Sequence, residues 1–214
     1  MKSIAIVDYG MGNLGSVSNA CAFLRFRAEV VVSPSGLDRH DAVILPGVGA
    51  FGDCVGHLRR HGFVDALRGW IASGRPFLGI CVGLQALFES SEESPGVEGL
   101  GVLRGVVRRF RPGPERKIPQ MGWNRLAIRQ PACPMFEGVP DGAHVYFVHS
   151  YFPVPADASI VAAETEYGET YASAVWRGNV FAVQFHPEKS QAVGRRILLN
   201  FGRWIESFGP EGRP

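Results

Sequence analysis

Short apolar runs alternate with amphipathic segments from the N-terminus to about residue 90, and this alternation limits the possible folds more than any other feature of the chain. The apolar runs that predict strands are Ser3–Asp8, Ala28–Ser33, Ala42–Leu45 and Pro76–Ile80. The amphipathic segments that predict helices are Leu14–Phe26, Asp53–His61, Phe63–Ser73 and Val82–Ser90. Nearly continuous apolar strands separated by helices are typical of a parallel sheet with helices on both faces. The first half of the chain therefore predicts an α/β fold.

The pattern changes after Ser90, where strand-like segments follow one another without helices. These segments are Gly101–Phe110, Arg125–Arg129, Val145–Phe152, Ile160–Glu166, Tyr171–Trp176 and Val180–Phe185. Pro- and Gly-rich turns join them, which favours hairpins. Gln191–Phe208 has apolar residues near helical spacing and predicts a final helix. We expect an open mixed, mainly parallel sheet flanked by helices, with an additional antiparallel strand region in the C-terminal half.

The composition indicates one globular domain and argues against several classes of partner. The chain has 214 residues, of which 46% are hydrophobic, so we expect a single domain over residues 1–208 and a flexible tail over 209–214. A formal net charge of +2 is too balanced to make nucleic acid or a membrane surface the default partner. No segment approaches the ~20 apolar residues of a membrane span, and Asp8 interrupts the apolar run that a secretory signal needs. Four cysteines without CxxC spacing complete the prediction of a reduced, cytoplasmic protein.

Gly10, Gly12 and Gly15 form the pattern G-x-G-x-x-G directly after the first predicted strand. A dinucleotide site also needs an acidic residue about 20 positions later, at the end of the second strand. That strand ends at Ser33, and Asp38 lies beyond a Pro-Ser-Gly turn, so the acid is poorly placed. The favoured interpretation is a tight turn in which glycines permit unusual backbone angles. A dinucleotide site is the minor alternative, and no cofactor is expected.

The segment Gly79-Ile80-Cys81-Val82-Gly83 follows a predicted strand and opens a predicted helix. This is the arrangement of the G-x-S-x-G nucleophile elbow, with cysteine in place of serine. Glycines two positions before and after the nucleophile relieve crowding against neighbouring elements, and the helix N-terminus favours a thiolate. The Val82 amide is placed to stabilise an oxyanion. A small buried cysteine is the alternative for Cys81, and it is the favoured interpretation for Cys21, Cys54 and Cys133.

A thiolate nucleophile needs a base that is itself oriented. The apolar strand VFAVQF ends in His186-Pro187-Glu188, where the two-residue spacing can place His186 and Glu188 on one side. Glu188 could then hold the imidazole while His186 faces the sulfur. A structural histidine is the usual alternative at a strand end, but the cysteine elbow favours catalysis. The order Cys…His…Glu differs from the order in α/β-hydrolases.

The loop Pro46-Gly47-Val48-Gly49-Ala50-Phe51 follows the strand Ala42–Leu45 and fits a second oxyanion donor. Its glycines would let a peptide turn its amide toward the developing charge or away from it. A plain turn is the alternative. His57 and His61 lie four residues apart on a predicted helix, with arginines between them, so an exposed polar face is favoured over metal binding and no metal site is expected.

Together, the motifs GICVGLQ, HPE and PGVGAF resemble those of the class I (triad) glutamine amidotransferases. The segments DYGMGNLGSV, KIPQMGWN and YFVHSYF narrow the resemblance to the glutaminase subunits of imidazole glycerol phosphate synthases, which serve histidine biosynthesis. The resemblance extends from about residue 3 to residue 205. Val82 stands where leucine is expected, and it supplies the same backbone amide.

The resemblance implies the substrate L-glutamine and a role for each motif. Cys81 would attack the side-chain carboxamide, His186 would move protons and Glu188 would orient His186. The oxyanion would be held by the amides of Val82 and Val48. The residues implied in binding substrate are Gly49, Gln85, His149, Ser150 and Tyr151.

The resemblance also implies a partner, a (β/α)8-barrel cyclase subunit that receives the ammonia. That subunit forms imidazole glycerol phosphate and an aminoimidazole carboxamide ribonucleotide, and the glutaminase is expected to be nearly silent until the partner binds its own ligand. The residues implied at the interface are Asn13, Trp123, Asn124 and Lys189. For Trp123, the polar, Pro-flanked segment independently suggests an exposed anchor, with a core tryptophan as the alternative.

Several alternatives to this function stay open at this point. One is a triad amidotransferase of another pathway, and others are a cysteine-elbow stress or chaperone protein and an inactive interaction subunit. A basic cluster, opposed only by Glu115, favours a solvated strand face or a partner-facing rim over nucleic acid. Its members are Arg104, Arg108, Arg109, Arg111, Arg116 and Lys117.

Overall fold

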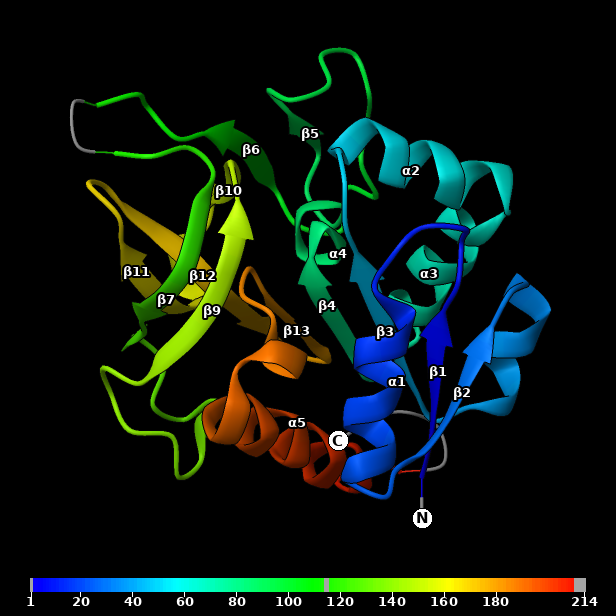
Figure 1. Ribbon diagram of the computed structural model, residues 1–214. Coiled ribbons are helices and arrows are strands. Elements are labelled where there is room, and N and C mark those ends of the chain that lie inside the picture. The colour runs from blue at the N-terminus through cyan, green and yellow to red at the C-terminus, as the bar shows by residue number, and fades with distance from the viewer. Residues whose placement is uncertain (1, 114–115, 210–214) are drawn as a thin grey trace.

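An eight-stranded mixed sheet forms the centre of the molecule (Figure 1). The computed structural model describes residues 2–113 and 116–209. The sheet order is β2-β1-β3-β4-β13-β12-β11-β8. The first five strands in this order are parallel to one another, and the remaining three neighbouring pairs are antiparallel. The strand bounds are β1 Ser3–Val7, β2 Arg27–Val31, β3 Ala42–Gly47, β4 Phe77–Cys81, β8 Ala127–Ile128, β11 Val161–Glu166, β12 Thr170–Arg177 and β13 Val180–Val183.

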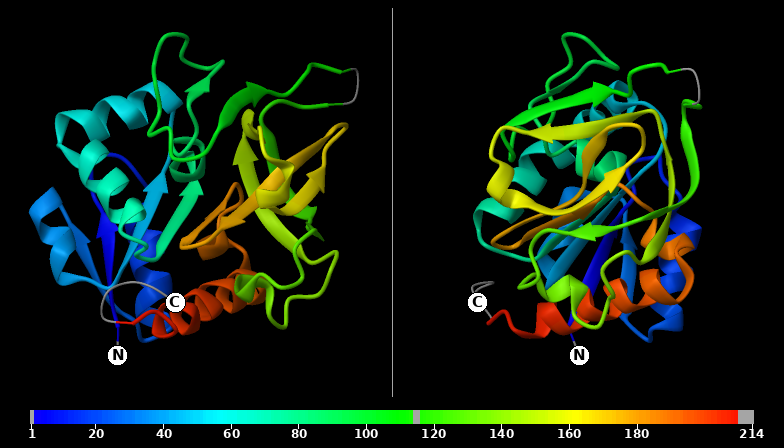
Figure 2. Two further views of the ribbon diagram at one scale, coloured as in Figure 1. Left: turned by 180° about the vertical axis from the view of Figure 1, so that it is seen from behind. Right: turned by 90° about the vertical axis from the view of Figure 1, so that its left-hand side faces the viewer.

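Helices cover both faces of the parallel half of this sheet (Figure 2). Two of them, α1 and α5, lie on one face, and α2 and α3 lie on the other. Their bounds are α1 Leu14–Phe23, α2 Phe51–Arg60, α3 Phe63–Ala72 and α5 Gln191–Glu206, and the single-turn helix α4 is Val82–Gln85. Strands β1, β3, β4 and β13 are almost entirely buried, because helices exclude water from both of their faces.

Two smaller sheets come from the C-terminal half. One has the order β10-β6-β5, and the other is the antiparallel ribbon β7-β9. The strand bounds are β5 Ser90–Ser91, β6 Gly105–Arg109, β7 Gln120–Arg125, β9 His144–His149 and β10 Tyr151–Pro155. The predicted antiparallel region is therefore present. Strand β9 runs toward the carboxyl edge of the central sheet (Figure 1).

Several predicted elements differ from the structure: the strand predicted for Gly101–Phe110 begins only at Gly105, as β6, and of the strand predicted for Arg125–Arg129 only Ala127–Ile128 forms β8. The helix predicted for Val82–Ser90 ends at Gln85, because the Ala86 and Leu87 carbonyls accept hydrogen bonds from Leu100 and Leu103 instead of from the next helical turn. The predicted strand Val145–Phe152 is interrupted at Ser150, since its halves pair with β7 and β6 in different sheets. The prediction for Leu14–Phe26 was also too long, because the chain turns at Arg25, whose φ is 58°.

Strand β7 was missed altogether. It carries Met121 and Trp123, two positions apart, on an exposed face of a two-stranded ribbon, so its apolar side chains do not mark a buried face. The segment Gly10–Gly12 is the tight turn that the sequence favoured, with φ values of 82° and 128° at the two glycines. Of the predicted flexible tail, residues 210–214 lie outside the described residues.

Candidate active site

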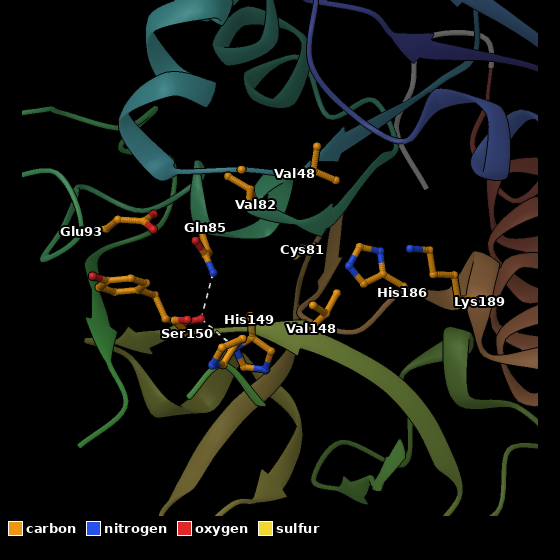
Figure 3. A pocket seen from close by; sticks show the side chains of 13 residues that line it. Val48, Cys81, Val82, Gln85, Glu93, Val148, His149, Ser150, His186 and Lys189 are labelled. Atoms are coloured by element: carbon orange, nitrogen blue, oxygen red, sulfur yellow. Dashed lines mark hydrogen bonds between the residues drawn. The ribbon is translucent and has the colours of Figure 1, made fainter. Parts of the chain in front are cut away.

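A cavity of about 290 Å³ opens at the carboxyl ends of β3, β4 and β9 (Figure 3). In open α/β sheets this edge is where ligands bind. The lining residues are Val48, Gly49, Cys81, Val82, Gln85, Glu93, Pro119, Val148, His149, Ser150, Tyr151, His186 and Lys189. The structure thus brings most of the predicted site residues to one cavity, from segments far apart in the sequence.

Cys81 stands at a sharp turn between β4 and α4. Its φ of 56° and ψ of −110° are unusual for a residue with a side chain, and such strain is concentrated at functional sites. A Cβ on Gly79 would lie 2.8 Å from the Gly83 carbonyl oxygen, and a Cβ on Gly83 would lie 2.0 Å from the Leu45 carbonyl oxygen. The predicted reason for both glycines is therefore confirmed: neither position has room for a side chain.

His186 and Glu188 form a buried pair beside Cys81. The Nδ1 atom of His186 and the Oε1 atom of Glu188 are 2.8 Å apart, and both side chains are almost fully buried. Burial alone would lower the pKa of His186, but its interactions with Cys81 and Glu188 outweigh burial and raise this pKa to about 10. The imidazole is therefore charged at neutral pH and is held between an acidic orienting group and the sulfur.

The loop after β3 lies directly next to the elbow. Gly47 pairs with Cys81 in the register of β3 and β4, so Val48 and Val82 both follow the paired ends of neighbouring strands and line the cavity. Gly49 has a φ of 81°, which favours glycine. The two predicted oxyanion donors are therefore adjacent in space although they are 34 positions apart.

The opposite wall of the cavity is formed by the segment His149–Tyr151 (Figure 3). The Tyr151 carbonyl oxygen accepts hydrogen bonds from Gln85 Nε2 at 2.9 Å and from His149 Nδ1 at 2.8 Å. Burial lowers the pKa of His149 to about 3, so this ring is neutral. The side chain of His149 is hydrogen-bonded within the protein, so the backbone of the segment His149–Tyr151 is left to face the cavity.

Two polar residues at the site, and the apolar lining residues Pro119 and Val148, were not predicted. Gln184 Nε2 lies 3.6 Å from the Cys81 sulfur, and Glu93 reaches the cavity from the loop after β5. Glu93 Oε2 also accepts a hydrogen bond from the Phe51 amide at 2.7 Å. Gln184 follows β13 directly and precedes His186 by two positions, but residues 184 and 185 form a bend, so strand alternation in the sequence does not indicate that its side chain reaches the sulfur. No sequence signal indicates Glu93, because only the loop conformation brings it to the cavity.

The predicted interface residues are placed differently from one another. Trp123 is 47% exposed, so the anchor interpretation is favoured over a core tryptophan. Its ring contacts Tyr146 edge-on at 6.1 Å, and Lys189 Nζ lies 5.9 Å from the same Tyr146 ring, at the border of the cavity. Asn13 instead caps α1 by accepting from the Ser16 amide at 3.4 Å.

Asn124 also uses its side chain within the chain, since its Nδ2 donates to the Glu166 carbonyl oxygen at 2.9 Å. The basic cluster is opposed by Glu169, which lies far from it in the sequence. Glu169 binds Arg108 at 3.0 Å and Arg116 at 2.8 Å, while Glu115 lies outside the described residues. Pairing with Glu169 accounts for the presence of two arginines of the basic cluster, with no need for a nucleic-acid ligand.

In the described part of the chain, no three His, Cys, Asp or Glu side chains are grouped to hold a metal ion. His57 Nδ1 instead lies 3.2 Å from the Tyr9 carbonyl oxygen, and its ring stacks on His61. None of the helices within residues 2–113 and 116–209 is long and apolar enough to cross a membrane.

Comparison with known proteins agrees with this geometry. The family model described as glutamine amidotransferase class-I matches residues 5–203. The chain belongs to this family. Proteins named imidazole glycerol phosphate synthase subunit HisH from Syntrophotalea carbinolica and Geobacter sulfurreducens are 52% and 49% identical to it. Those alignments cover 93% and 94% of this chain and 98% and 99% of the relatives, so this class I amidotransferase is also a member of the HisH subunit family.

Solved structures confirm the predicted fold class. A structure titled glutamine amidotransferase has a TM-score of 0.74 at 22% identity, covering 94% of this chain and 98% of that chain. PurLQS from Thermotoga maritima has a TM-score of 0.75 at 20% identity, covering 96% and 100%. Family membership confirms the amidotransferase resemblance and decides against the stress-protein alternative.

Proposed function

We propose that the chain is the glutaminase subunit of an imidazole glycerol phosphate synthase and hydrolyses glutamine to glutamate and ammonia. One observation carries this proposal: Cys81 stands at a strained elbow beside the buried His186–Glu188 pair, in a cavity open to small molecules. Similarity to HisH subunits over almost the whole chain supports the choice of pathway. The cavity volume of about 290 Å³ lies just below the ~300–1,000 Å³ usual for ligand sites and suits a small substrate such as a single amino acid.

In the proposed mechanism, the Cys81 thiolate attacks the carboxamide carbon of glutamine. The oxyanion that forms is stabilised by the amides of Val48 and Val82, each donor of this kind being worth about 3 kcal/mol. The charged His186 gives its proton to the departing nitrogen, so that ammonia leaves and a glutamyl thioester remains. Water then gives a proton to His186 and attacks the thioester, the C–S bond breaks, and glutamate and the thiolate–imidazolium pair result.

Substrate selection follows from the charges on the cavity wall. The Glu93 carboxylate can accept hydrogen bonds from the α-amino group of glutamine. We propose that Gln85 and the backbone of Gly49 and His149–Tyr151 contact the same end of the substrate, including its α-carboxylate. Because the cavity presents an acid at one end and the elbow at the other, it favours a molecule with an ammonium group and a carboxamide.

The name HisH denotes a subunit, and we propose a (β/α)8-barrel cyclase subunit as the partner that receives the ammonia. The proposed docking surface contains Met121 and Trp123 on β7, together with Lys189 beside the cavity. Met121 and Trp123 are 65% and 47% exposed, which is unusual for large apolar side chains and typical of interface anchors. Asn13 and Asn124 would contribute mainly by holding the local backbone.

We propose that residues 1–208 form one domain, supported by a continuous cluster of buried apolar side chains that extends from Ile4 to Phe208. We also propose a cytoplasmic location, supported by the free thiols of Cys21, Cys54, Cys81 and Cys133.

The test is glutamate release from glutamine by the purified chain, alone and with the cyclase subunit and its nucleotide ligand. We expect weak activity alone, strong stimulation in the liganded complex, and loss of activity in Cys81→Ser. High activity without the partner would contradict the proposed dependence on the cyclase. Absence of glutamate release in both states would contradict the glutaminase assignment.

A further inference from the structure

The Cys81 sulfur has a second polar neighbour that the mechanism above does not use. Gln184 Nε2 lies 3.6 Å from Sγ, within hydrogen-bonding distance for sulfur, and Gln184 is fully buried. Its backbone is held by the next strand, since the Gln184 amide donates to the Ser173 carbonyl oxygen at 2.9 Å. The side chain of Gln184 is therefore held close to the reacting atom.

The direction of this contact follows from a chain of hydrogen bonds rather than from the appearance of the amide group, whose oxygen and nitrogen are easily exchanged. The Tyr151 carbonyl oxygen can only accept, so the Gln85 atom 2.9 Å from it is the amide nitrogen. The same nitrogen lies 3.1 Å from Gln184, which must therefore present its oxygen there. The remaining end of Gln184, facing Cys81, is then the NH₂ group.

We propose that Gln184 is a further catalytic residue, which donates a hydrogen bond to the Cys81 thiolate, and that Gln85 is the positioning residue that orients it. This inference rests on the proposed role of Cys81 as the nucleophile. It also refines the role of Gln85, because both amide hydrogens of Gln85 are used within the protein. Only its Oε1 atom is left for the substrate, where it can accept from the α-amino group.

A hydrogen bond to a charged acceptor is stronger than one to a neutral acceptor. The Gln184 amide therefore stabilises the thiolate more than the thiol, and more than the neutral sulfur of the glutamyl thioester. The bond is made before glutamine is attacked, and it is made again when the thiolate leaves during hydrolysis. Gln184 thus acts on the two states in which the sulfur carries charge.

The other groups that face the sulfur do not replace this donor. The Tyr9 phenol and the Cys54 thiol lie close enough to interact with Cys81, but burial raises the pKa of each, to about 12 for Cys54, and both stay neutral at physiological pH. The charged His186 is the strongest neighbour and is already part of the mechanism. The remaining titratable groups on the cavity wall are Glu93, His149, Tyr151 and Lys189.

The test measures alkylation of Cys81 by iodoacetamide as a function of pH, quantified by peptide mass spectrometry, in the full chain. Gln184→Met keeps the length of the side chain but removes the donor. We expect the midpoint of its alkylation profile to move up by about one to two pH units, so that at a pH below both midpoints alkylation is slower by about tenfold or more. Gln184→Glu keeps the oxygen that Gln85 needs and places a second oxygen at the sulfur, so it should move the profile in the same direction.

Ser173→Ala is the matched control. Ser173 is as buried as Gln184, and its hydroxyl has no hydrogen-bond partner within the described residues. We expect its alkylation profile to equal that of the wild type. A wild-type midpoint in Gln184→Met and Gln184→Glu would overturn the inference, as would an equal shift in Ser173→Ala. Circular dichroism identifies a variant that does not fold, in which case the other Gln184 variant decides.

This experiment is independent of glutamine turnover. If the alkylation profile shifts as expected but the wild-type complex releases no glutamate, the proposed function fails and the hydrogen bond to the thiolate stands. If the complex is active and the profile does not shift, only the role of Gln184 fails.

Discussion

Gly83 in α4 lies so close to Leu45 in β3 that a Cβ at position 83 would stand 2.0 Å from the Leu45 carbonyl oxygen. The elbow that carries Cys81 therefore lies at the end of β4 and packs directly against the backbone of β3. The obstructing atom is a main-chain oxygen of the buried sheet, so it cannot move aside as the end of a flexible side chain could. Close backbone packing is what keeps the nucleophile at the mouth of the cavity.

Gly83→Ala is expected to displace the elbow. Overpacking of a rigid site costs about 1–3 kcal/mol or more, so we expect a lower free energy of unfolding and loss of most glutamine hydrolysis in the complex. The control is Gly69→Ala in α3, where a Cβ would meet nothing within 4 Å. That change should leave activity unaltered and stabilise the helix by about 0.5–1 kcal/mol. Urea unfolding and glutamate release measure both, and equal behaviour of the two variants would contradict the packing argument.

The charge on His186 links stability to pH. Its pKa is raised from 6.5 to about 10 in the folded protein, so the charged imidazole contributes stability that is fully present below pH 6.5 and is lost as the pH rises through 10. Glu188→Gln removes a negative charge from the pair, so the pKa of His186 should fall and the loss should occur at lower pH. The measurement is the free energy of unfolding across this pH range in both proteins. Identical pH dependence would show that Glu188 does not hold the imidazolium.

Glu169 is expected to stabilise the C-terminal half through its arginine partners. It binds Arg108 and Arg116 and also accepts from the Arg111 amide at 3.1 Å. We expect Glu169→Gln to lower the free energy of unfolding by about 1–2 kcal/mol, with a smaller difference at high salt because ions screen the pairs. The exposed Glu98 is the control, and Glu98→Gln should have no effect. A loss that does not depend on salt would indicate packing instead of charge.

Trp123 is expected to contribute to partner binding and little to stability. Truncation of a half-exposed aromatic anchor typically weakens binding by about 2 kcal/mol, or about 30-fold. Trp123→Ala should therefore raise the Kd for the cyclase subunit, measured by isothermal titration calorimetry, while the unfolding free energy changes by less than about 0.5 kcal/mol. Val106→Ala, which alters a comparably exposed residue on β6, should bind normally. Unchanged affinity in Trp123→Ala would place the interface elsewhere.

Much of the parallel half of the fold could be predicted because its signals are local. The buried strands are continuous apolar runs, and α2 and α3 have the expected apolar face on either side of Gly62, whose φ is 73°. The predictions were wrong where the structure of a segment depends on a distant segment of the chain with which it pairs or packs. The helix after Cys81 stops after one turn because a loop about 14 residues later takes its carbonyl groups, and β7 forms because β9 is available to pair with it.

The candidate site shows the same division. The sequence by itself determined the elbow at Cys81 and the His186–Glu188 pair, because each depends on the spacing of residues within five positions. Only the tertiary structure decided that Gln184 reaches the Cys81 sulfur, that Gln85 orients Gln184, and that Glu93 enters the cavity. The two Gln184 contacts join residues that are 103 and 99 positions apart. Contacts over such separations depend on strand order and register, which follow from the packing of the whole sheet and leave no trace in the local pattern.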